Sequence, residues 1–235
     1  VVEELRAIKD AHELELVSRA ASISDRVYED LAQEQLSGRS ERDLAWWVER
    51  RFRELGADAT AFEPIVAAGP NGARPHHHPG DDLIPAGTLV VIDIGCTIDG
   101  YCSDCTRTFA TGPLSPELER AYALVADAQA AGLAAVRAGV RGVEADAASR
   151  TGIEAAGLGG AYAHGLGHGI GLDVHEAPTL RPESTDTLQA GNLVTVEPGL
   201  YLPGAGGCRI EDLVAVTDTG CERLTRFTRE LVTVC

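Results

Sequence analysis

The sequence predicts an α+β fold built from two similar halves of one domain, at about residues 1–113 and 114–235. Each half contains two helical patterns, then a segment with histidines, then two β-rich runs typical of antiparallel strands. Each strand pair carries two acidic residues among apolar ones. The halves share little sequence identity, so the duplication is one of pattern. With 235 residues and 44% hydrophobic content, the chain can bury a full core.

The first half begins with apolar residues near helical spacing, which predict one long helix over residues 3–35. A second helix is predicted from Ser40, where Ser-Glu-Arg-Asp resembles a capping box, to a stop at Gly56. A short strand follows over residues 62–68, and the turn residues Gly69-Pro70-Asn71-Gly72 end it.

A hairpin is the central feature of this half. Residues 89–92 are an apolar run typical of a buried strand, and Asp99-Gly100 is a hairpin signal, so residues 101–109 are predicted to return as the partner strand. Asp93 follows the first run and Asp104 lies in the second, so we expect the two carboxylates to come close across the hairpin. Two carboxylates in apolar surroundings require a shared proton or cations.

The second half repeats this order. A helix is predicted from the cap at Ser115-Pro116-Glu117 to about residue 138, and another over residues 142–156, closed by a glycine. A Gly- and His-rich passage over residues 163–175 leads into an apolar strand at residues 192–200. The return of that strand is predicted over residues 207–216.

The composition argues against some partners. A net charge of −16 disfavours nucleic acid, because the phosphate backbone would be repelled. No apolar run is long enough to cross a bilayer and no signal-peptide pattern is present, so we expect a cytoplasmic protein without a membrane partner. The chain lacks Met even at position 1, so we expect that residues or a whole domain once preceded it. We expect all of the cysteines to be reduced and most to be buried: Cys96, Cys102, Cys105, Cys208, Cys221 and Cys235.

The acidic residues of the two hairpins predict a metal site. Glu197 and Glu211 occupy in the second hairpin the places that Asp93 and Asp104 hold in the first. Four acids in one cleft cannot all stay ionised in a low-dielectric environment, and two divalent cations would balance them. We expect a further ligand from residues 164–176, whose histidines are four and seven residues apart and whose glycines let the backbone approach a site closely.

Seven motifs in order make the chain recognisable. In them the sequence resembles the pita-bread metallopeptidases, and within these the proline-specific branch of Xaa-Pro aminopeptidases and Xaa-Pro dipeptidases. The motifs are Gly69-Pro70-Asn71 with Pro75-His76, Asp93-Ile94-Gly95, Gly100 to Phe109, His164-Gly165-Leu166-Gly167-His168-Gly169-Ile170-Gly171, Val174-His175-Glu176-Ala177-Pro178, Glu197-Pro198-Gly199-Leu200-Tyr201 and Cys208-Arg209-Ile210-Glu211-Asp212.

The resemblance implies two divalent metal ions held by five side chains. Asp104 and Glu211 would bridge the metals, Asp93 would complete one site, and His168 with Glu197 would complete the other. Four oxygen ligands to one nitrogen favour manganese, with cobalt or zinc as alternatives.

The resemblance also implies a pita-bread fold, with helices around a curved antiparallel sheet, and an exopeptidase. The enzyme would hydrolyse the bond between an N-terminal residue and proline through a hydroxide that bridges the two metals. Its substrates would be peptides with proline at the second position. Relatives of this branch carry a separate N-terminal domain that is absent here and that contributes to a dimer, so a homodimer is one expected assembly.

Catalytic and substrate-binding roles are implied for several further side chains. Glu197 would be the general base, and His76 and His175 would bind the substrate and stabilise the tetrahedral intermediate. His164 would line the substrate pocket. Arg209 would share a strand face with the acid two residues later and is included among the substrate-binding residues.

Two neighbouring histidines are expected to lie outside the site. His77 and His78 have no counterpart in the motifs and are expected to be exposed loop residues.

A methionine aminopeptidase-like enzyme is an alternative function, but the Arg-x-Glu pattern at Arg209 favours the proline-specific branch. A catalytically inactive binding module is another, against which the intact ligand set argues. Creatine-hydrolysing relatives lack that ligand set.

Overall fold

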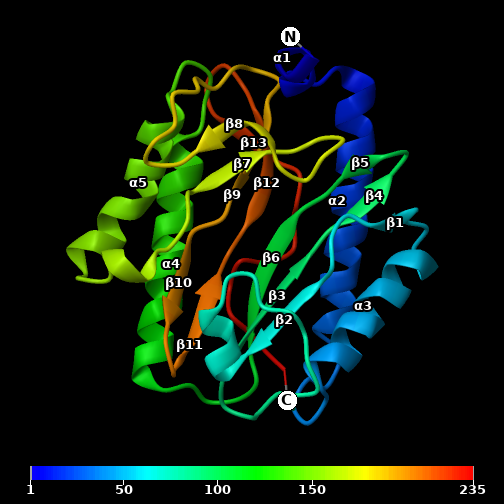
Figure 1. Cartoon of the computed structure of the whole chain (residues 1–235), viewed down its shortest axis with the longest axis vertical. Coiled ribbons are helices and arrows are strands. Elements are labelled where there is room, and N and C mark those ends of the chain that lie inside the picture. Colours follow the sequence, from blue (N-terminus) through cyan, green and yellow to red (C-terminus); the bar gives the residue numbers. More distant parts are fainter. Residues whose placement is uncertain (1, 235) are drawn as a thin grey trace.

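The computed structural model describes residues 2–234, in which helices flank mostly antiparallel sheets. Helices α2 and α3 lie on one side of the strands and α4 and α5 on the other (Figure 1). This arrangement confirms the predicted α+β class. The helices are α1 (Val2–Ala7), α2 (Ala11–Leu31), α3 (Glu41–Glu54), α4 (Pro116–Ala135) and α5 (Gly142–Ala155), with 3-10 turns η1 (Gly69–Ala73) and η2 (Gly159–Ala161).

The strands among residues 2–234 form four sheets, and each predicted hairpin is divided between a larger and a smaller one. One sheet has the order β14-β6-β3-β2 and another the order β13-β12-β9-β7-β8; the smaller sheets are β1-β4-β5 and β10-β11. The strands are β1 (Ala59–Thr60), β2 (Ile65–Ala68), β3 (Leu89–Ile94), β4 (Cys96–Ile98), β5 (Tyr101–Cys102), β6 (Cys105–Ala110), β7 (Gly167–Gly169), β8 (Glu176–Leu180), β9 (Leu193–Val196), β10 (Gly199–Leu202), β11 (Gly206–Arg209), β12 (Asp212–Val216), β13 (Cys221–Arg223) and β14 (Val232–Thr233).

Each predicted hairpin is broken into two short strand pairs. In the first half β3 pairs with β6, while β4 and β5 form a separate tip that turns at Asp99-Gly100, where both residues have positive φ. The break falls at Gly95, where a Cβ would lie only 2.1 Å from the carbonyl oxygen of Ser103. In the second half β9 pairs with β12, and β10 pairs with β11. The acidic residues lie at or next to these breaks.

The helix predictions are confirmed except at the N-terminus. Helices α3, α4 and α5 have the predicted positions, and Ser40 and Ser115 cap the first two of them. The single helix over residues 3–35 is wrong, because α1 ends at Ala7 and α2 begins at Ala11. Asp10 accepts hydrogen bonds from the backbone of His12 and Glu13 and forms a capping box that starts α2.

The predicted strand at residues 62–68 is shorter, since β2 begins at Ile65. The C-terminal strand β14 pairs in parallel with β6 and so joins the sheet of the first half. The division of the chain near residue 113 stays a prediction.

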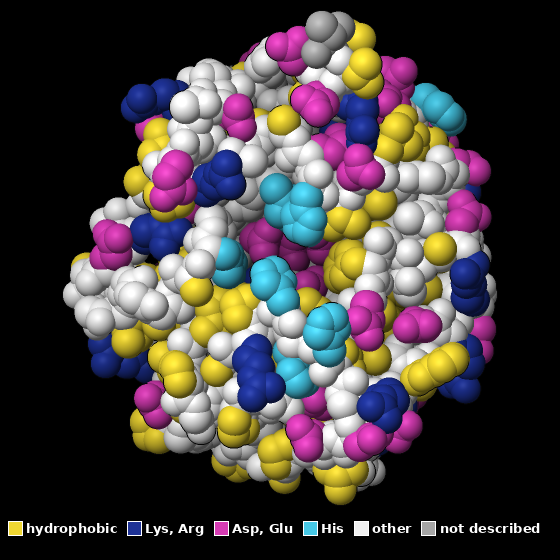
Figure 2. All heavy atoms as spheres, viewed as in Figure 1, with side chains coloured by type: hydrophobic (Ala, Val, Ile, Leu, Met, Phe, Trp, Pro, Cys, Tyr) yellow, Lys and Arg dark blue, Asp and Glu magenta, His cyan; other side chains and the backbone are white. Residues whose placement is uncertain are grey.

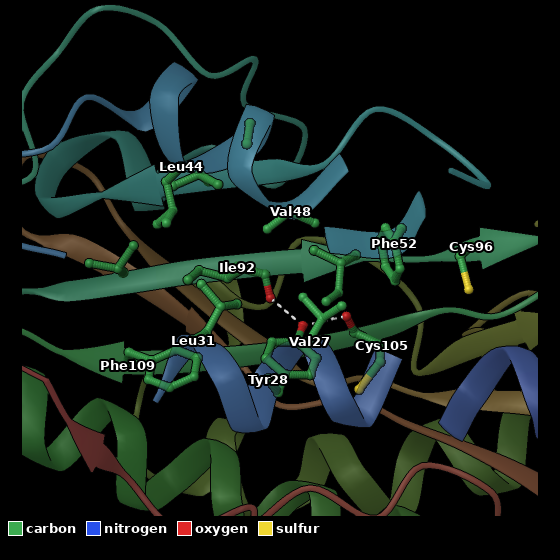
Figure 3. Close-up of a cluster of buried hydrophobic side chains, with 14 of the residues drawn as sticks. Val27, Tyr28, Leu31, Leu44, Val48, Phe52, Ile92, Cys96, Cys105 and Phe109 are labelled. Atoms are coloured by element: carbon green, nitrogen blue, oxygen red, sulfur yellow. Dashed lines mark hydrogen bonds between the residues drawn. The ribbon is translucent and has the colours of Figure 1, made fainter. Parts of the chain in front are cut away.

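A hydrophobic cluster packs α2 and α3 against β3 and β6 (Figure 3). Leu44, Val48 and Phe52 recur at helical spacing along α3, and all three are fully buried. Tyr28 of α2 donates its hydroxyl to the carbonyl oxygens of Ile92 and Cys105, at 2.8 and 2.7 Å. This bond ties the two strands together beside the acidic end of the hairpin.

The described cysteines are free, as predicted, and four of these five are buried. Cys235 lies outside the described residues. Among residues 2–234, none of the helices has the length and apolar character needed to cross a bilayer.

Candidate metal centre

One cavity of about 850 Å³ collects every side chain for which the sequence predicts a role. Figure 2 shows this hollow with acidic side chains at its floor and histidines around its rim. The nine predicted residues that line it are His76, Asp93, Asp104, His164, His168, His175, Glu197, Arg209 and Glu211. Their placement follows from the two sheets, which bring segments from both halves to one cleft.

Four carboxylates reach the cavity from the two strand pairs. Asp93 lies in β3 and Asp104 directly precedes β6. Glu197 directly follows β9, and Glu211 directly precedes β12. The antiparallel ladder pairs Val196 with Asp212. Glu197 and Glu211 each lie one residue beyond this pair, so they are neighbours across the two strands.

His168 presents one ring nitrogen to these carboxylates. Its Nδ1 donates to the carbonyl oxygen of Gly169 at 3.0 Å, which leaves Nε2 as the atom that faces the cavity. Nε2 lies 3.2 Å from Glu197 and 3.6 Å from Asp104. One possible ligand atom from each of Asp104, His168 and Glu211 lies within 4.8 Å of the others. This spacing suits a shared cation.

Two buried carboxylate oxygens have no hydrogen-bond partner among the described residues, Oδ1 of Asp93 and Oε1 of Glu211. The other oxygen of each group is held: Arg209 donates to Asp93 at 2.6 Å, and Thr106 donates to Glu211 at 2.7 Å. A buried carboxylate oxygen without a donor is costly. The orphaned atoms therefore fit a bound divalent cation.

The pKa values of the acids also indicate a cation site. Burial raises the pKa of Asp93 and raises the pKa values of Asp104 and Glu211 well above their usual range, with neighbouring carboxylates adding to the effect. Burial also opposes ionisation of Glu197. The hydrogen bond with His168 and the charges of the His168, His164 and Arg209 side chains outweigh burial and lower the pKa of Glu197 to about 2. Cations would restore the ionised form of the other three.

Arg209, expected to support the acid cluster from the strand face that it shares with Glu211, contacts that cluster at Asp93. It contacts Asp93 directly, and its Nε donates to the hydroxyl of Thr106 at 2.9 Å. It is thus linked to Glu211 only through that threonine. Arg209 also donates to the hydroxyl of Tyr201 at 2.9 Å.

The sequence analysis missed two threonines that orient the acids. Thr106 donates to Glu211, and Thr195 donates to Glu197 at 3.0 Å while accepting from the backbone of His168 at 3.1 Å. Strand alternation was the available signal, since Thr195 lies two residues before Glu197 and therefore on the same face.

The predicted substrate-binding histidines differ in hydrogen bonding and in exposure. His164 bonds the carbonyl oxygen of Gly165 through Nδ1 and the hydroxyl of Tyr201 through Nε2, both at 2.7 Å, so both of its nitrogens are engaged. His76 and His175 are exposed at the cavity. The ring of His175 lies 4.3 Å from that of His168, centroid to centroid.

The prediction that His77 is exposed is wrong. The residue is 9% exposed, and its side chain donates from Nε2 to a carboxylate oxygen of Glu41 at 2.7 Å. His78 is exposed, as predicted, and pairs with Glu63 at 2.8 Å. Residues 74–77 form a turn, in which the backbone N–H of His77 donates to the carbonyl oxygen of Arg74 at 3.2 Å, so no strand period in the sequence distinguishes the buried histidine from its neighbours.

Comparisons with known proteins agree with this geometry. Residues 15–218 match the sequence model of metallopeptidase family M24. The chain is 38% identical to a protein named Xaa-Pro dipeptidase from Pyrococcus furiosus, over 99% of this chain and 67% of that protein.

Solved structures are similar over nearly the whole chain. The X-Pro aminopeptidase from Thermotoga maritima matches with a TM-score of 0.96 and 38% identity, over 99% of this chain and 66% of that one. The Xaa-Pro dipeptidase from Bacillus anthracis matches with a TM-score of 0.98 and 42% identity, over 99% and 66%. This chain therefore spans about two thirds of the length of these relatives. The matches confirm the predicted pita-bread fold.

Proposed function

Because the chain belongs to metallopeptidase family M24, we propose that it is a metal-dependent exopeptidase that cleaves between an N-terminal residue and proline. The observation that carries the proposal is the convergence of four carboxylates and His168 on one cavity, with two buried carboxylate oxygens unpaired. The relatives named Xaa-Pro dipeptidase and X-Pro aminopeptidase support the choice of a bond next to proline.

Two divalent cations are the proposed cofactor. Asp104 and Glu211 would contact both, Asp93 would complete one site, and His168 with Glu197 would complete the other. The preponderance of oxygen ligands favours manganese over cobalt or zinc. When bound, the cations would polarise the scissile carbonyl and lower the pKa of water.

The chain's own residues would bind the substrate and move its protons. Glu197 is ionised at neutral pH because its pKa is about 2, so its carboxylate can accept a proton and pass it to the leaving nitrogen. His76 and His175 face the cavity and would donate hydrogen bonds to the carbonyl oxygen as negative charge develops there. Partial burial at the cavity lowers the pKa of His175, which favours the neutral ring, and that ring can donate through one N–H.

The proposed setting is the cytoplasm, as a homodimer acting on peptides with proline at the second position. The described cysteines are free and mostly buried, in keeping with a reducing compartment. Size-exclusion chromatography with light scattering would measure the assembly, and a monomer would contradict the dimer.

The proposal is tested by turnover. The manganese-loaded protein should release proline-containing product from Xaa-Pro dipeptides and tripeptides, and chelation should abolish the release. Peptides with alanine in place of proline are the matched control and should be cleaved far more slowly. Absence of turnover on all Xaa-Pro peptides, with two metals per chain verified by elemental analysis, would refute it.

A further inference from the structure

The three consecutive histidines at the cavity mouth alternate in direction. His76 and His78 are exposed, whereas His77 is 9% exposed and faces away from solvent into the protein. His76 is assigned a role by the proposed function, while nothing in that function uses its buried neighbour. The contacts of His77 therefore require a separate explanation.

The partner of His77 is a carboxylate that joins three segments. Glu41, at the first position of α3, is 1% exposed. One of its oxygens accepts from the backbone N–H of Ala68 at 2.9 Å and from the side-chain amide of Asn71 at 3.1 Å. The other oxygen accepts from Nε2 of His77 at 2.7 Å. Glu41 thus ties the end of β2, the turn η1 and the histidine segment to one helix.

The histidine segment, residues 74–80, has other contacts that are long or exposed. The carbonyl oxygen of Pro75 accepts from Arg209 at 3.5 Å, the N–H of Gly80 donates to Glu41 at 3.5 Å, and the exposed His78 pairs with Glu63 at 2.8 Å. The segment contains no helix or strand. Backbone bonds fix its two ends, since Arg74 donates to Asn71 at 3.0 Å and Arg42 donates to Gly80 at 2.9 Å. Between these ends the backbone N–H of His77 donates to the carbonyl oxygen of Arg74 at 3.2 Å, and the side chain of His77 makes a short, buried hydrogen bond directly next to His76.

We propose that His77 is a positioning residue, which through its bond to Glu41 holds His76 at the place in the cavity where it meets the substrate carbonyl. The inference rests on the proposed function for the role of His76. A misplacement of about 1 Å in a catalytic group can cost roughly 100-fold in rate, so a lost anchor in an irregular segment has a large kinetic effect. His77 itself touches neither substrate nor metal in this account.

A double-mutant cycle separates positioning from a general structural role. H77A should lower kcat/KM about tenfold or more in the wild-type background and less than about twofold in the H76A background, because the loss acts through His76. H77Q keeps a donor for Glu41 and should recover part of the rate. H12A is the control, since His12 is an exposed histidine that does not line the cavity, and should leave kcat/KM unchanged. An equal loss from H77A in both backgrounds would overturn the inference.

A measurement on the metal-free protein makes the test independent of turnover. Hydrogen–deuterium exchange of residues 74–80 should be faster in H77A than in wild type and unchanged in H12A. Unchanged exchange in H77A would overturn the inference. If wild type turns over no Xaa-Pro peptide, the proposed function fails, and the exchange result alone decides whether His77 anchors the segment.

Discussion

The guanidinium of Arg209 lies 2.6 Å from one carboxylate oxygen of Asp93 and leaves the other oxygen of that acid without a hydrogen-bond partner. The contact joins β11 of the second half to β3 of the first. A fixed cation on one side of the carboxylate favours its ionised form and orients the free oxygen. The candidate metal site and its support therefore combine strands that lie far apart in the sequence.

Loss of the Arg209 cation should make metal binding more sensitive to pH. Arg209 lowers the pKa of Asp93 against the larger effect of burial, so R209Q should raise that pKa further. Protons then compete with metal over a wider range, and the pH of half-maximal manganese binding should rise by about 1 unit or more. Calorimetric titrations from pH 5 to 8 measure this. R209K keeps the charge and should shift less; coinciding curves for wild type and R209Q would contradict the prediction.

Removal of Glu211, which we propose to bridge the two cations, should remove metal. Glu211 contributes a buried oxygen without a partner, so E211A should reduce the metal content from two ions per chain to one or none. Elemental analysis after gel filtration is the measurement. The control E222A alters an exposed acid of β13 and should retain both ions. Two ions in E211A would rule out the assigned role.

The buried hydroxyl of Tyr28 should contribute to stability. Y28F leaves the carbonyl oxygens of Ile92 and Cys105 without this donor, at a cost of about 1–3 kcal/mol in the free energy of unfolding. Urea denaturation measures the difference. Y101F removes a hydroxyl that donates to Glu13 from a half-buried side chain, so its effect should be smaller. Equal losses of unfolding free energy in Y28F and Y101F would contradict the prediction that the buried hydroxyl contributes more.

An ion-pair cluster beside His175 should give pH-dependent stability. Lys9 contacts Glu176 at 3.1 Å with both side chains buried, and Arg6 pairs with the same acid. Burial raises the pKa of Glu176, but the backbone N–H of Asp173 and the two cations outweigh it and lower the pKa. A lowered carboxyl pKa stabilises the fold above the unfolded value of about 4.3, and this stabilisation is lost as pH falls through the folded value.

E176Q should therefore cost about 3 kcal/mol at pH 7, because it leaves buried Lys9 unpaired. The difference from wild type should shrink below about pH 4. Denaturant titrations at pH 7 and pH 3.5 compare the two proteins, and a difference that stays constant with pH would be the contrary result.

A methyl group at position 167 should disturb the metal site. A Cβ on Gly167 would lie 2.0 Å from the carbonyl oxygen of Thr195, so G167A must push β7 away from β9 and displace His168. We expect a loss of about 1–3 kcal/mol in stability together with weaker metal binding. G160A places its Cβ where nothing lies within 4 Å and should leave both quantities unchanged. Normal manganese affinity in G167A would contradict the prediction.

Sequence alone determined the features that depend on neighbouring residues. Caps and glycine stops placed α3, α4 and α5, and apolar runs with turn residues placed the strand pairs. The order of the motifs also identified nine of the side chains that line the cavity. The capping box at Asp10 was equally local, so the break between α1 and α2 was readable in principle.

Only the tertiary structure decided the partners of these residues. His77 is buried because Glu41, 36 residues away, supplies the acceptor, and Arg209 reaches Asp93 across 116 residues, a partner that the strand face alone did not name. Lys9 and Glu176 meet across 167 residues. Local patterns report helix and strand periods, whereas the contacts that bury a polar group depend on how distant segments pack, and that is settled only when the fold is complete.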